Sequence, residues 1–553
     1  MNHLHRNRAA IGALLAVFVL ATLYALSIRA LAPPDEGRYA EMAREMFASG
    51  DWITTRLDGI KYFEKPPLQA WMNALSFAVF GLGEWQARLW TGLCGIFGVV
   101  LTGYTGARLF GPRVGLHAAL VLASCFYWAG FSQVDSLDMG LSAMLALSLC
   151  ALLLAQRDGA GETERRRWML ACWAGMALAT LSKGLVGIVL PGAVLVLYTL
   201  AARAPRIWTR LRIVPGLALF LLVAAPWFVL VGLKNPEQPH FFFVHEHVER
   251  FLLKEHHREA PWYFFILLLA AGSLPWLGML GHSLAAGLRA RTDDGVLRPR
   301  LLLATWVVFI VVFFSLSSSK LPGYILPVYP ALALLVARRI EDASPRLLGA
   351  NAGLALLTGL LLLAVAPCAH RFGLPSDQVT PYEAWLPWIG AAGALLLAGG
   401  ALALWCARRG WRGAHVLALA LAGFGATQLL LAGSDTLGRW RAGAELAPII
   451  ERVLTPSTRL YSVGVYAQSL TFYLGRPLTL AAYEDEFAFG LAQEPALAIP
   501  TVPAFVEQWR RDMAAGVASV AIVRPDIVAD LQEQHVPLRI VATDTMRTVI
   551  ANR

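Results

Sequence analysis

The sequence predicts a polytopic α-helical membrane protein with about thirteen membrane-spanning helices and a C-terminal soluble α/β domain. Of its 553 residues, 57% are hydrophobic, and the mean hydropathy is +0.55, values that exclude an ordinary soluble globular chain. After Ser434 the hydropathy falls, and short strand-like runs replace the long apolar ones. We therefore expect a membrane domain over residues 1–432 and an outer domain over residues 433–553.

The apolar runs approach the length of about 20 residues that crosses roughly 30 Å of hydrocarbon. They lie at roughly 10–30, 87–107, 112–130, 136–156, 167–182, 184–202, 211–233, 262–285, 301–318, 322–338, 347–366, 385–407 and 413–432. The first run follows Arg6 and Arg8, and its length and the lack of a small-residue cleavage site predict a retained anchor. An odd number of spans places the two termini on opposite sides of the membrane.

Arginines occur in every second loop, the distribution expected of cytoplasmic loops. The clusters begin at Arg6, Arg108, Arg157, Arg203, Arg289, Arg338 and Arg408. The N-terminus is therefore predicted to be cytoplasmic and the C-terminal domain to lie outside. The net charge of +10 then reflects topology and attraction to anionic membrane lipids rather than nucleic-acid binding. No Gly-rich nucleotide-binding motif stands in a strand-to-helix context.

Two outward loops are long, at residues 31–86 and 234–261, and we expect them to cover one cavity. The outer domain has strand-like runs at 459–466, 477–480, 517–523 and 538–542, with helical stretches at 440–454 and 503–515. This alternation predicts an α/β domain of about 120 residues.

The first long loop carries most of the polar chemistry. After Asp35, apolar residues recur at helical spacing, which predicts a short interfacial helix that has Asp35 near its N-cap and stops at Gly50-Asp51. Asp58-Gly59 predicts a turn, and Pro66-Pro67 predicts an extended chain into the next helix. A carboxylate at the mouth of a lipid-bounded cavity suits Asp35 to act as a base, although capping the helix is the simpler alternative.

A second acidic pair is Asp135 and Asp138, whose i, i+3 spacing predicts one face at the outer mouth of the fourth span. The pair is suited to steer a cationic group or to hold a site together, and capping of the span is the competing interpretation. Glu36, next to Asp35, is assigned to structure or to substrate contact.

Cations from three outward segments could bind a lipid phosphate, for which a lysine and an arginine make a suitable clamp. For any single cation, snorkelling to the membrane interface is the default explanation, but their recurrence on one face favours convergence. These candidates are Lys65 with Tyr62, Arg250, and Lys320 with Tyr324, while Lys183 stays ambiguous between a phosphate contact and a snorkelling cation. A candidate site for a divalent metal such as zinc consists of Glu64, His245, Glu246 and His247. The simpler interpretation is that these side chains have a structural role or hold a proton.

Three stretches resemble the lipid-linked-sugar glycosyltransferases of the protein O-mannosyltransferase superfamily, and most of all the bacterial 4-amino-4-deoxy-L-arabinose transferases that modify lipid A. The stretches are DEGRYAEMAREMFASGDWITTRLDGIKYFEKPPLQAW, EHVERF and SSSKLPGY. One departure is Thr55, where the family pattern has a proline before Arg56, which affects loop stiffness. The resemblance implies a GT-C fold with Asp35 as the catalytic acidic residue, Asp138 as a second one, and Lys65, Arg250 and Tyr324 on the donor phosphate.

The resemblance further implies an inverting glycosyltransferase of the bacterial inner membrane. It would move aminoarabinose from undecaprenyl phosphate to lipid A phosphates at the periplasmic face, as a monomer that requires no metal cofactor, and so confer polymyxin resistance. Two alternatives stay open. One is a protein O-mannosyltransferase-like enzyme with a protein acceptor, and the other is a flippase for lipid-linked sugars. The lack of an internal repeat and the outward position of the charges argue against a transporter.

Overall fold

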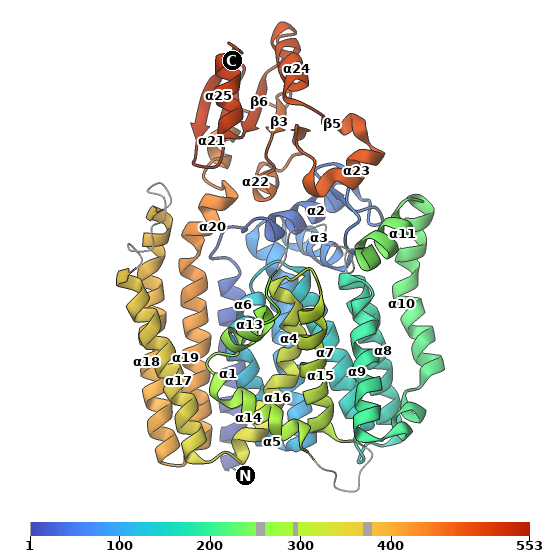
Figure 1. Cartoon of the computed structure of the whole chain (residues 1–553), viewed down its shortest axis with the longest axis vertical. Helices are drawn as coiled ribbons and strands as arrows, with labels where there is room; N and C mark the ends of the chain where they lie inside the picture. Colours follow the sequence, from blue (N-terminus) through green and yellow to red (C-terminus); the bar gives the residue numbers. More distant parts are fainter. Residues whose placement is uncertain (1, 250–259, 291–296, 369–378) are drawn as a thin grey trace.

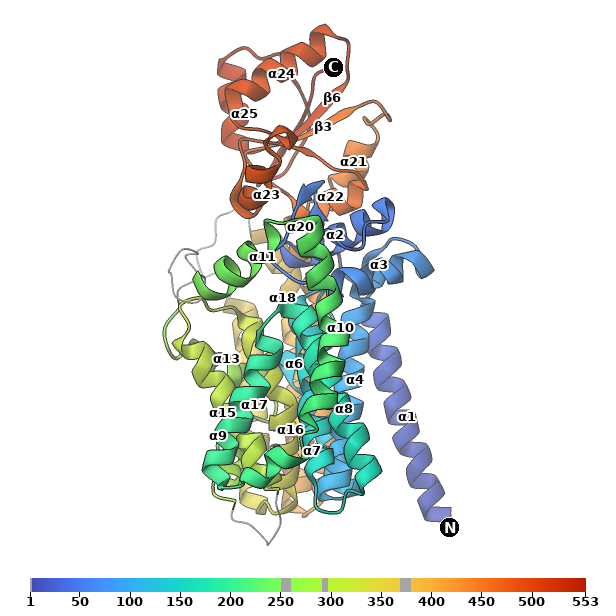
Figure 2. The same ribbon diagram turned by 90° about the vertical axis from the view of Figure 1, so that its right-hand side faces the viewer.

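Each predicted apolar run overlaps a helix, or two consecutive helices, in the computed structural model, which describes residues 2–249, 260–290, 297–368 and 379–553. The long helices form a bundle, with the N-terminus at one end and the C-terminal domain beyond the other (Figures 1 and 2). The bundle consists of α1 (Asn2–Ala25), α4 (Glu84–Phe110), α5 (Pro112–Ser124), α6 (Phe126–Phe131), α7 (Leu137–Gln156), α8 (Glu162–Lys183), α9 (Val186–Ala202), η1 (Pro205–Arg210), α10 (Ile213–Lys234), α13 (Phe264–Gly272), α14 (Leu277–Leu288), α15 (Pro299–Leu316), η3 (Pro322–Val328), α16 (Tyr329–Glu341), α17 (Pro345–Cys368), α18 (Val379–Arg408) and α19 (Arg412–Gly433).

Among the described residues, eight helices are long and apolar enough to cross a membrane, and nine if the bent pair α13 and α14 counts as one span. This pair turns by 112° at a break that contains Pro275. Proline has no backbone N–H to donate to the preceding turn, so it interrupts a helix. Three further apolar helices are shorter: Ala9–Ala25 within α1, α3 (Leu68–Phe80) and α9. The chain is therefore a multi-pass membrane protein, while the number of thirteen spans stays a prediction.

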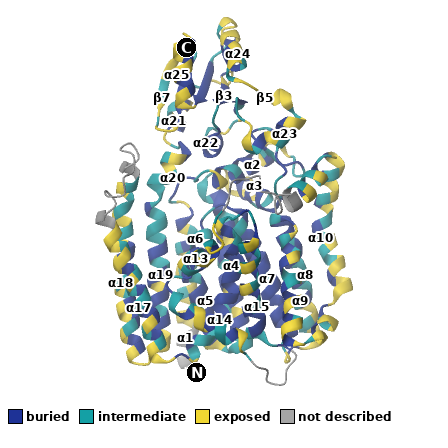
Figure 3. Cartoon of the chain, viewed as in Figure 1, coloured by how far each residue is buried: buried dark blue, intermediate teal, exposed yellow. Residues whose placement is uncertain are grey.

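The centre and the rim of the bundle differ in burial (Figure 3). In α7, 83% of the apolar window is buried inside the protein, whereas in α10 only 22% is buried. A helix that is apolar all round but mostly uncovered by protein faces the hydrocarbon of the membrane. Helix α7 is thus a central element, and it brings Asp138 in its first turn to the end of the bundle near the C-terminal domain.

The arginine-rich turns between α4 and α5, between α7 and α8, and between α18 and α19 lie at the end of the bundle that carries the N-terminus (Figures 1 and 2). The first long loop lies at the other end, under the C-terminal domain. The alternation of arginines along the sequence thus corresponds to the two ends of the bundle.

The first loop folds into α2 (Asp35–Ser49), the two-stranded hairpin of β1 (Arg56–Leu57) and β2 (Ile60–Lys61), and α3. Helix α2 ends at Gly50, whose φ of +71° is easily reached only by glycine, and the hairpin turns at Asp58 and Gly59, both also at positive φ. The predicted stop and turn are both confirmed. The side chain of Thr55 donates to the Tyr62 carbonyl oxygen at 2.5 Å, a hydrogen bond that ties the two arms of the hairpin together at this position.

The second long loop packs against the first. Its described part contains α11 (Gln238–His240) and the π-helix η2 (Phe241–Glu249). Two ion pairs join the loops, Lys61 Nζ to Glu237 Oε1 and Lys234 Nζ to Asp51 Oδ2, each at 2.7 Å. These contacts show that the two loops pack against each other, while the cavity they are expected to cover stays a prediction.

The C-terminal part begins with α20 (Asp435–Ala442) and α21 (Ala447–Glu451) and contains a six-stranded sheet in the order β5-β4-β3-β6-β8-β7. Strands β5, β4, β3 and β6 are parallel, and β8 is antiparallel to both β6 and β7. The strands are β3 (Arg459–Val463), β4 (Thr479–Ala481), β5 (Ala498–Ile499), β6 (Ser519–Val523), β7 (Arg539–Thr543) and β8 (Thr548–Ala551), and the other helices are α22 (Gln468–Leu474), η5 (Asp485–Phe487), α23 (Ala488–Gln493), η6 (Pro495–Leu497), α24 (Val502–Ala514) and α25 (Pro525–Glu533). The sequence analysis missed β5 and β8, which have only two and four residues.

The C-terminal domain rests directly on the first loop. Arg56 donates to both oxygens of Glu494, at 2.9 and 3.0 Å, and the Leu478 N–H donates to Asp58 Oδ1 at 2.6 Å. Aromatic contact adds to these bonds, since the rings of Phe63 and Phe489 lie 6.2 Å apart. The domain therefore helps to fix the loop that carries Asp35.

The first loop contains a partly buried acid whose titration should be visible in the stability of the protein. Glu45 accepts the Gly59 N–H at 2.9 Å, and burial together with the nearby Glu41 carboxylate raises the pKa of Glu45 from 4.5 to about 8. A raised pKa means that the folded state binds the proton more tightly, so the stabilisation is full below pH 4.5 and is lost as the pH rises through about 8.

We expect the melting temperature of the protein in detergent to fall by about 2–4 °C more between pH 5 and pH 8.5 than it does in Glu45→Gln. Thermal unfolding across this pH range measures the effect. Glu451→Gln, which changes an exposed glutamate of the C-terminal domain, is the control and should keep the slope of the native chain. An unchanged slope in Glu45→Gln would contradict the assignment.

Candidate functional site

Asp35 is the first residue of α2, and the residue at the N-cap position is Pro34. Asp35 thus lies next to the N-cap, as predicted, and no side chain caps the helix at the N-cap position. Its carboxylate instead pairs with Arg38 one turn later, at 2.9 Å, and its side chain is 52% exposed. The carboxylate of Asp35 is therefore accessible to an incoming group.

Arg38 links Asp35 to the C-terminal domain. Its Nη1 lies 2.9 Å from Asp35 Oδ1, and its Nε lies 2.6 Å from Glu486 Oε2 in η5. Burial raises the pKa of Glu486, although the Arg38 guanidinium opposes this shift. Burial by itself would lower the pKa of Arg38, but Tyr62 and Glu486 hold that pKa above its ordinary value. The guanidinium thus stands between one accessible and one buried carboxylate.

Two buried tyrosines line the same region. Burial, followed by the Asp35 carboxylate, raises the pKa of Tyr39, and burial, followed by Glu64, raises that of Tyr62. Asp138 also acts on Tyr39. Residues from the first loop, from α7 and from the C-terminal domain therefore come within electrostatic range of one another, with both phenols held as neutral donors.

Glu36 and Asp135 are structural in this arrangement. Glu36 forms an ion pair with Arg88 at 2.6 Å and accepts a hydrogen bond from the Asp135 N–H at 2.9 Å. The Asp135 side chain is fully buried, and it accepts hydrogen bonds from Gln69 at 2.6 Å and from Asn73 at 2.8 Å. The prediction that Asp135 and Asp138 share a helix face is wrong. Helix α7 starts only at Leu137, after the extended residue Ser136, so Asp135 precedes the helix and points elsewhere.

Asp138 forms a second charged centre with a lysine from the next helix. Lys183, at the end of α8, donates to Asp138 Oδ1, and both side chains are mostly buried, with 14% and 15% exposed. The Lys183 ammonium also lies 4.7 Å above the ring of Tyr324, a cation–π distance. A methyl group at Gly323 would overlap the Asp138 carboxylate, so only glycine lets η3 approach α7 this closely.

The predicted phosphate-binding cations differ in their surroundings. Lys65 Nζ donates to the Glu64 carbonyl oxygen at 2.8 Å and lies 3.7 Å from its carboxylate, so it belongs to the first loop beside Tyr62. Lys320 Nζ donates to the Ser317 carbonyl oxygen at 2.7 Å, a bond within its own turn. Arg250 lies outside the described residues.

For the predicted metal group, Glu64 belongs to the first loop and His245 to η2, where the imidazole stacks on Phe241 with a ring separation of 5.2 Å. The side chain of His247 is outside the described part of the chain. Within that part, no three His, Cys, Asp or Glu side chains come together in a way that could hold a metal ion.

Sequence reasoning missed Arg38, Tyr39 and Glu486, and it left Lys183 unresolved. Arg38 and Tyr39 lie one helical turn after Asp35, and this i, i+3 and i+4 spacing was an available signal. No local signal marks Glu486, because it is separated from Asp35 by more than 400 residues. Only the docking of the C-terminal domain brings it to the site.

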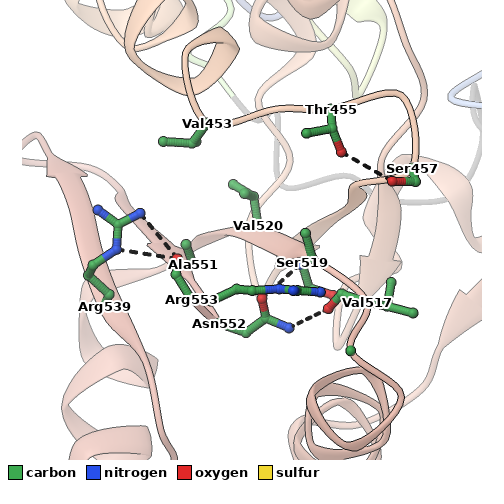
Figure 4. A pocket seen from close by; sticks show the side chains of 12 residues that line it. Val453, Thr455, Ser457, Val517, Ser519, Val520, Arg539, Ala551, Asn552 and Arg553 are labelled. Atoms are coloured by element: carbon green, nitrogen blue, oxygen red, sulfur yellow. Dashed lines mark hydrogen bonds between the residues drawn. The ribbon is translucent and has the colours of Figure 1, made fainter.

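A separate cavity of about 640 Å³ lies in the C-terminal domain, at the amino ends of β3 and β6 (Figure 4). Its walls include Thr455, Ser457, Asn552 and Arg539, which donates to the Arg553 carbonyl oxygen at 3.1 Å. It lies at the opposite end of β3 from α22, the helix that contacts α2, so it is not part of the charged cluster around Asp35.

Two family models match this chain. Residues 446–552 match the model described as "Aminoarabinose transferase C-terminal domain", and residues 64–230 match that described as "Dolichyl-phosphate-mannose-protein mannosyltransferase". The first match covers most of the outer domain, and the second covers the bundle from the end of the first loop to α10.

Curated relatives carry the name undecaprenyl phosphate-α-4-amino-4-deoxy-L-arabinose arabinosyl transferase. One from Sodalis glossinidius (strain morsitans) is 31% identical over 538 residues, which are 95% of this chain and 94% of the relative. One from Pseudomonas fluorescens (strain Pf0-1) is 35% identical over 368 residues, 65% of each chain, and one from Pseudomonas paraeruginosa (strain PA7) is 36% identical over 68% of each.

A solved structure is similar over nearly the whole length. The crystal structure of ArnT from Cupriavidus metallidurans bound to undecaprenyl phosphate is 37% identical, with a TM-score of 0.93, and the match covers 99% of this chain and 98% of that one. Its apo form has a TM-score of 0.92. This chain therefore belongs to the family of undecaprenyl phosphate-α-4-amino-4-deoxy-L-arabinose arabinosyl transferases, glycosyltransferases that use a lipid-linked donor.

Proposed function

We propose that this protein transfers 4-amino-4-deoxy-L-arabinose from undecaprenyl phosphate to phosphate groups of lipid A. The observation that carries the proposal is the full-length match to an ArnT crystal structure bound to undecaprenyl phosphate. The cluster of Asp35, Arg38 and Glu486 supports it, because an amino sugar and an acceptor phosphate require charges of both signs.

The proposed reaction is a single inverting displacement. An acceptor phosphate oxygen bonds to the anomeric carbon while the bond from that carbon to the donor phosphate oxygen breaks, which releases undecaprenyl phosphate. An ionised phosphate acceptor carries no proton to remove near neutral pH. Asp35 therefore acts by orienting the acceptor or the sugar ammonium, and it serves as a base only for a protonated acceptor.

The leaving phosphate needs cations, and Lys65 and Arg250 are proposed to supply them, with Lys320 and the hydroxyl of Tyr324 as further donors. Buried Tyr62 and Tyr39 are neutral donors toward the sugar. Asp138 is held by Lys183 and lies within electrostatic range of Tyr39. The proposal assigns the charge of the displacement to these groups and includes no metal ion, and it takes the protein to act as a monomer.

We further propose that the protein lies in the bacterial inner membrane, with the N-terminus cytoplasmic and the C-terminal domain periplasmic. The arginine-rich turns at the N-terminal end of the bundle support this orientation. The aminoarabinose would then add positive charge to lipid A outside the membrane, which weakens the binding of cationic polymyxins.

The test uses purified full-length protein, labelled undecaprenyl phosphate-aminoarabinose and lipid A. We expect label on lipid A and an equal amount of released undecaprenyl phosphate. Label on protein would instead indicate the protein O-mannosyltransferase-like alternative. Movement of intact donor across a vesicle membrane without release of undecaprenyl phosphate would indicate a flippase.

Lys65→Ala is expected to weaken donor binding by about 10- to 100-fold, the range for a lost charge-assisted hydrogen bond. Binding of undecaprenyl phosphate to the purified variant measures the effect. Lys234→Ala is the control, since this half-exposed lysine pairs with Asp51 and not with a residue of the charged cluster, and it should bind within about twofold of the native chain. Equal affinity of the Lys65→Ala variant and the native protein would remove Lys65 from the donor site.

A further inference from the structure

The end of the bundle that carries the N-terminus has a cavity far from the charged cluster. It measures about 620 Å³ and is lined by Tyr104, Thr163, Glu164, Arg167, Trp168 and Ala171. Tyr104 belongs to α4 and the other five residues to α8. Both helices pack extensively on α7, so the cavity lies where α4 and α8 flank that central helix.

Two of the residues that line the cavity are aromatic, and the surrounding charges are mainly cationic. The rings of Tyr104 and Trp168 lie 5.9 Å apart. Glu164 is already bonded to two arginines, at 2.9 Å to Arg108 and at 2.6 Å to Arg157. With exposed Arg167 as the third guanidinium, one carboxylate faces three cations, which leaves a surplus of positive charge that attracts an anion.

An apolar track leads away from this cavity along α4. Leu93, Phe97, Val100 and Tyr104 are all between 38% and 45% exposed, and their spacing of four, three and four residues places them on one helix face. In a multi-pass protein this uncovered face meets the acyl chains of the bilayer. The track ends at Tyr104, on whose ring the Arg108 guanidinium lies at 5.8 Å.

We propose that this cavity binds the headgroup of an anionic glycerophospholipid from the leaflet opposite the C-terminal domain. The lipid phosphate pairs with Arg167 and accepts from the Thr163 hydroxyl, and the acyl chains follow the α4 track. The positive surplus selects against zwitterionic headgroups, because their ammonium would face guanidinium groups. The continuous apolar track favours a lipid over a free phosphate, since a soluble phosphate gains nothing from it.

The test is native mass spectrometry of the delipidated full-length protein titrated with phosphatidylglycerol, with phosphatidylcholine or with soluble glycerol 1-phosphate. We expect one tight phosphatidylglycerol site that Arg167→Gln weakens by about fivefold, the effect of one interfacial arginine. Arg166→Gln removes the same charge from the neighbouring exposed position, which does not line the cavity, and should stay within about twofold. Arg167→Lys keeps the charge and should retain most of the affinity.

Three results would overturn the proposal. Arg166→Gln and Arg167→Gln could weaken binding equally, which would indicate general charge attraction. Phosphatidylcholine could bind as tightly as phosphatidylglycerol. Glycerol 1-phosphate could compete at the same concentration as the lipid, which would identify a site for soluble phosphates.

Discussion

Asp35→Asn is expected to lower the rate of sugar transfer by about 10²- to 10⁴-fold, the range for the loss of a positioned acid or base. The asparagine keeps the size of the side chain and its place at the start of α2, but it removes the charge that faces Arg38 and the incoming group. Single-turnover transfer to lipid A measures the loss. Because half of the side chain is exposed, we expect no comparable loss of stability.

Two comparisons make this result specific to Asp35. Asp530→Asn changes an exposed aspartate on α25 and should transfer sugar at the native rate. Binding of undecaprenyl phosphate to Asp35→Asn should stay within about threefold of native, since the proposed phosphate cations are unchanged. Native turnover by the variant would exclude Asp35 from the mechanism, and a loss confined to donor binding would reassign it to the donor site.

Lys183→Met is expected to reduce transfer by about 100-fold and to destabilise the protein by about 3 kcal/mol. The substitution leaves the mostly buried Asp138 carboxylate without its cation, and an unpaired buried charge carries a penalty of this size. It also removes the ammonium above the Tyr324 ring. Transfer rate and thermal unfolding in detergent measure the two effects separately.

The double variant Lys183→Met/Asp138→Asn separates structure from chemistry. Without the carboxylate no buried charge is unpaired, so most of the stability should return, whereas transfer should stay low because both charged groups are gone. Lys234→Met, at a half-exposed lysine, should change neither property by more than a small amount. Full recovery of transfer in the double variant would assign the pair a purely structural role.

The fold class follows from the sequence because membrane insertion is dictated by local composition. Apolar runs such as 211–233 and 413–432 have no stable state outside hydrocarbon or a protein interior, and arginine placement predicts their direction. The stop at Gly50 and the turn at Asp58-Gly59 were predictable for the same reason, since positive φ depends on the residue itself. Strands β5 and β8, which have two and four residues, were not predicted, because runs this short give only a weak periodic signal.

In the candidate site, too, some features follow from local sequence and others depend on the tertiary structure. The sequence determined that Asp35, Asp138 and Lys65 lie in or beside polar segments between apolar helices, because motif and hydropathy are properties of short stretches. Only the tertiary structure decided that Asp135 is a buried structural acid while Asp138 pairs with Lys183, and that Glu486 reaches Arg38. The physical reason is that these partners come from helices and domains far apart in the chain, and electrostatic pairing depends on distance in space rather than on separation in sequence.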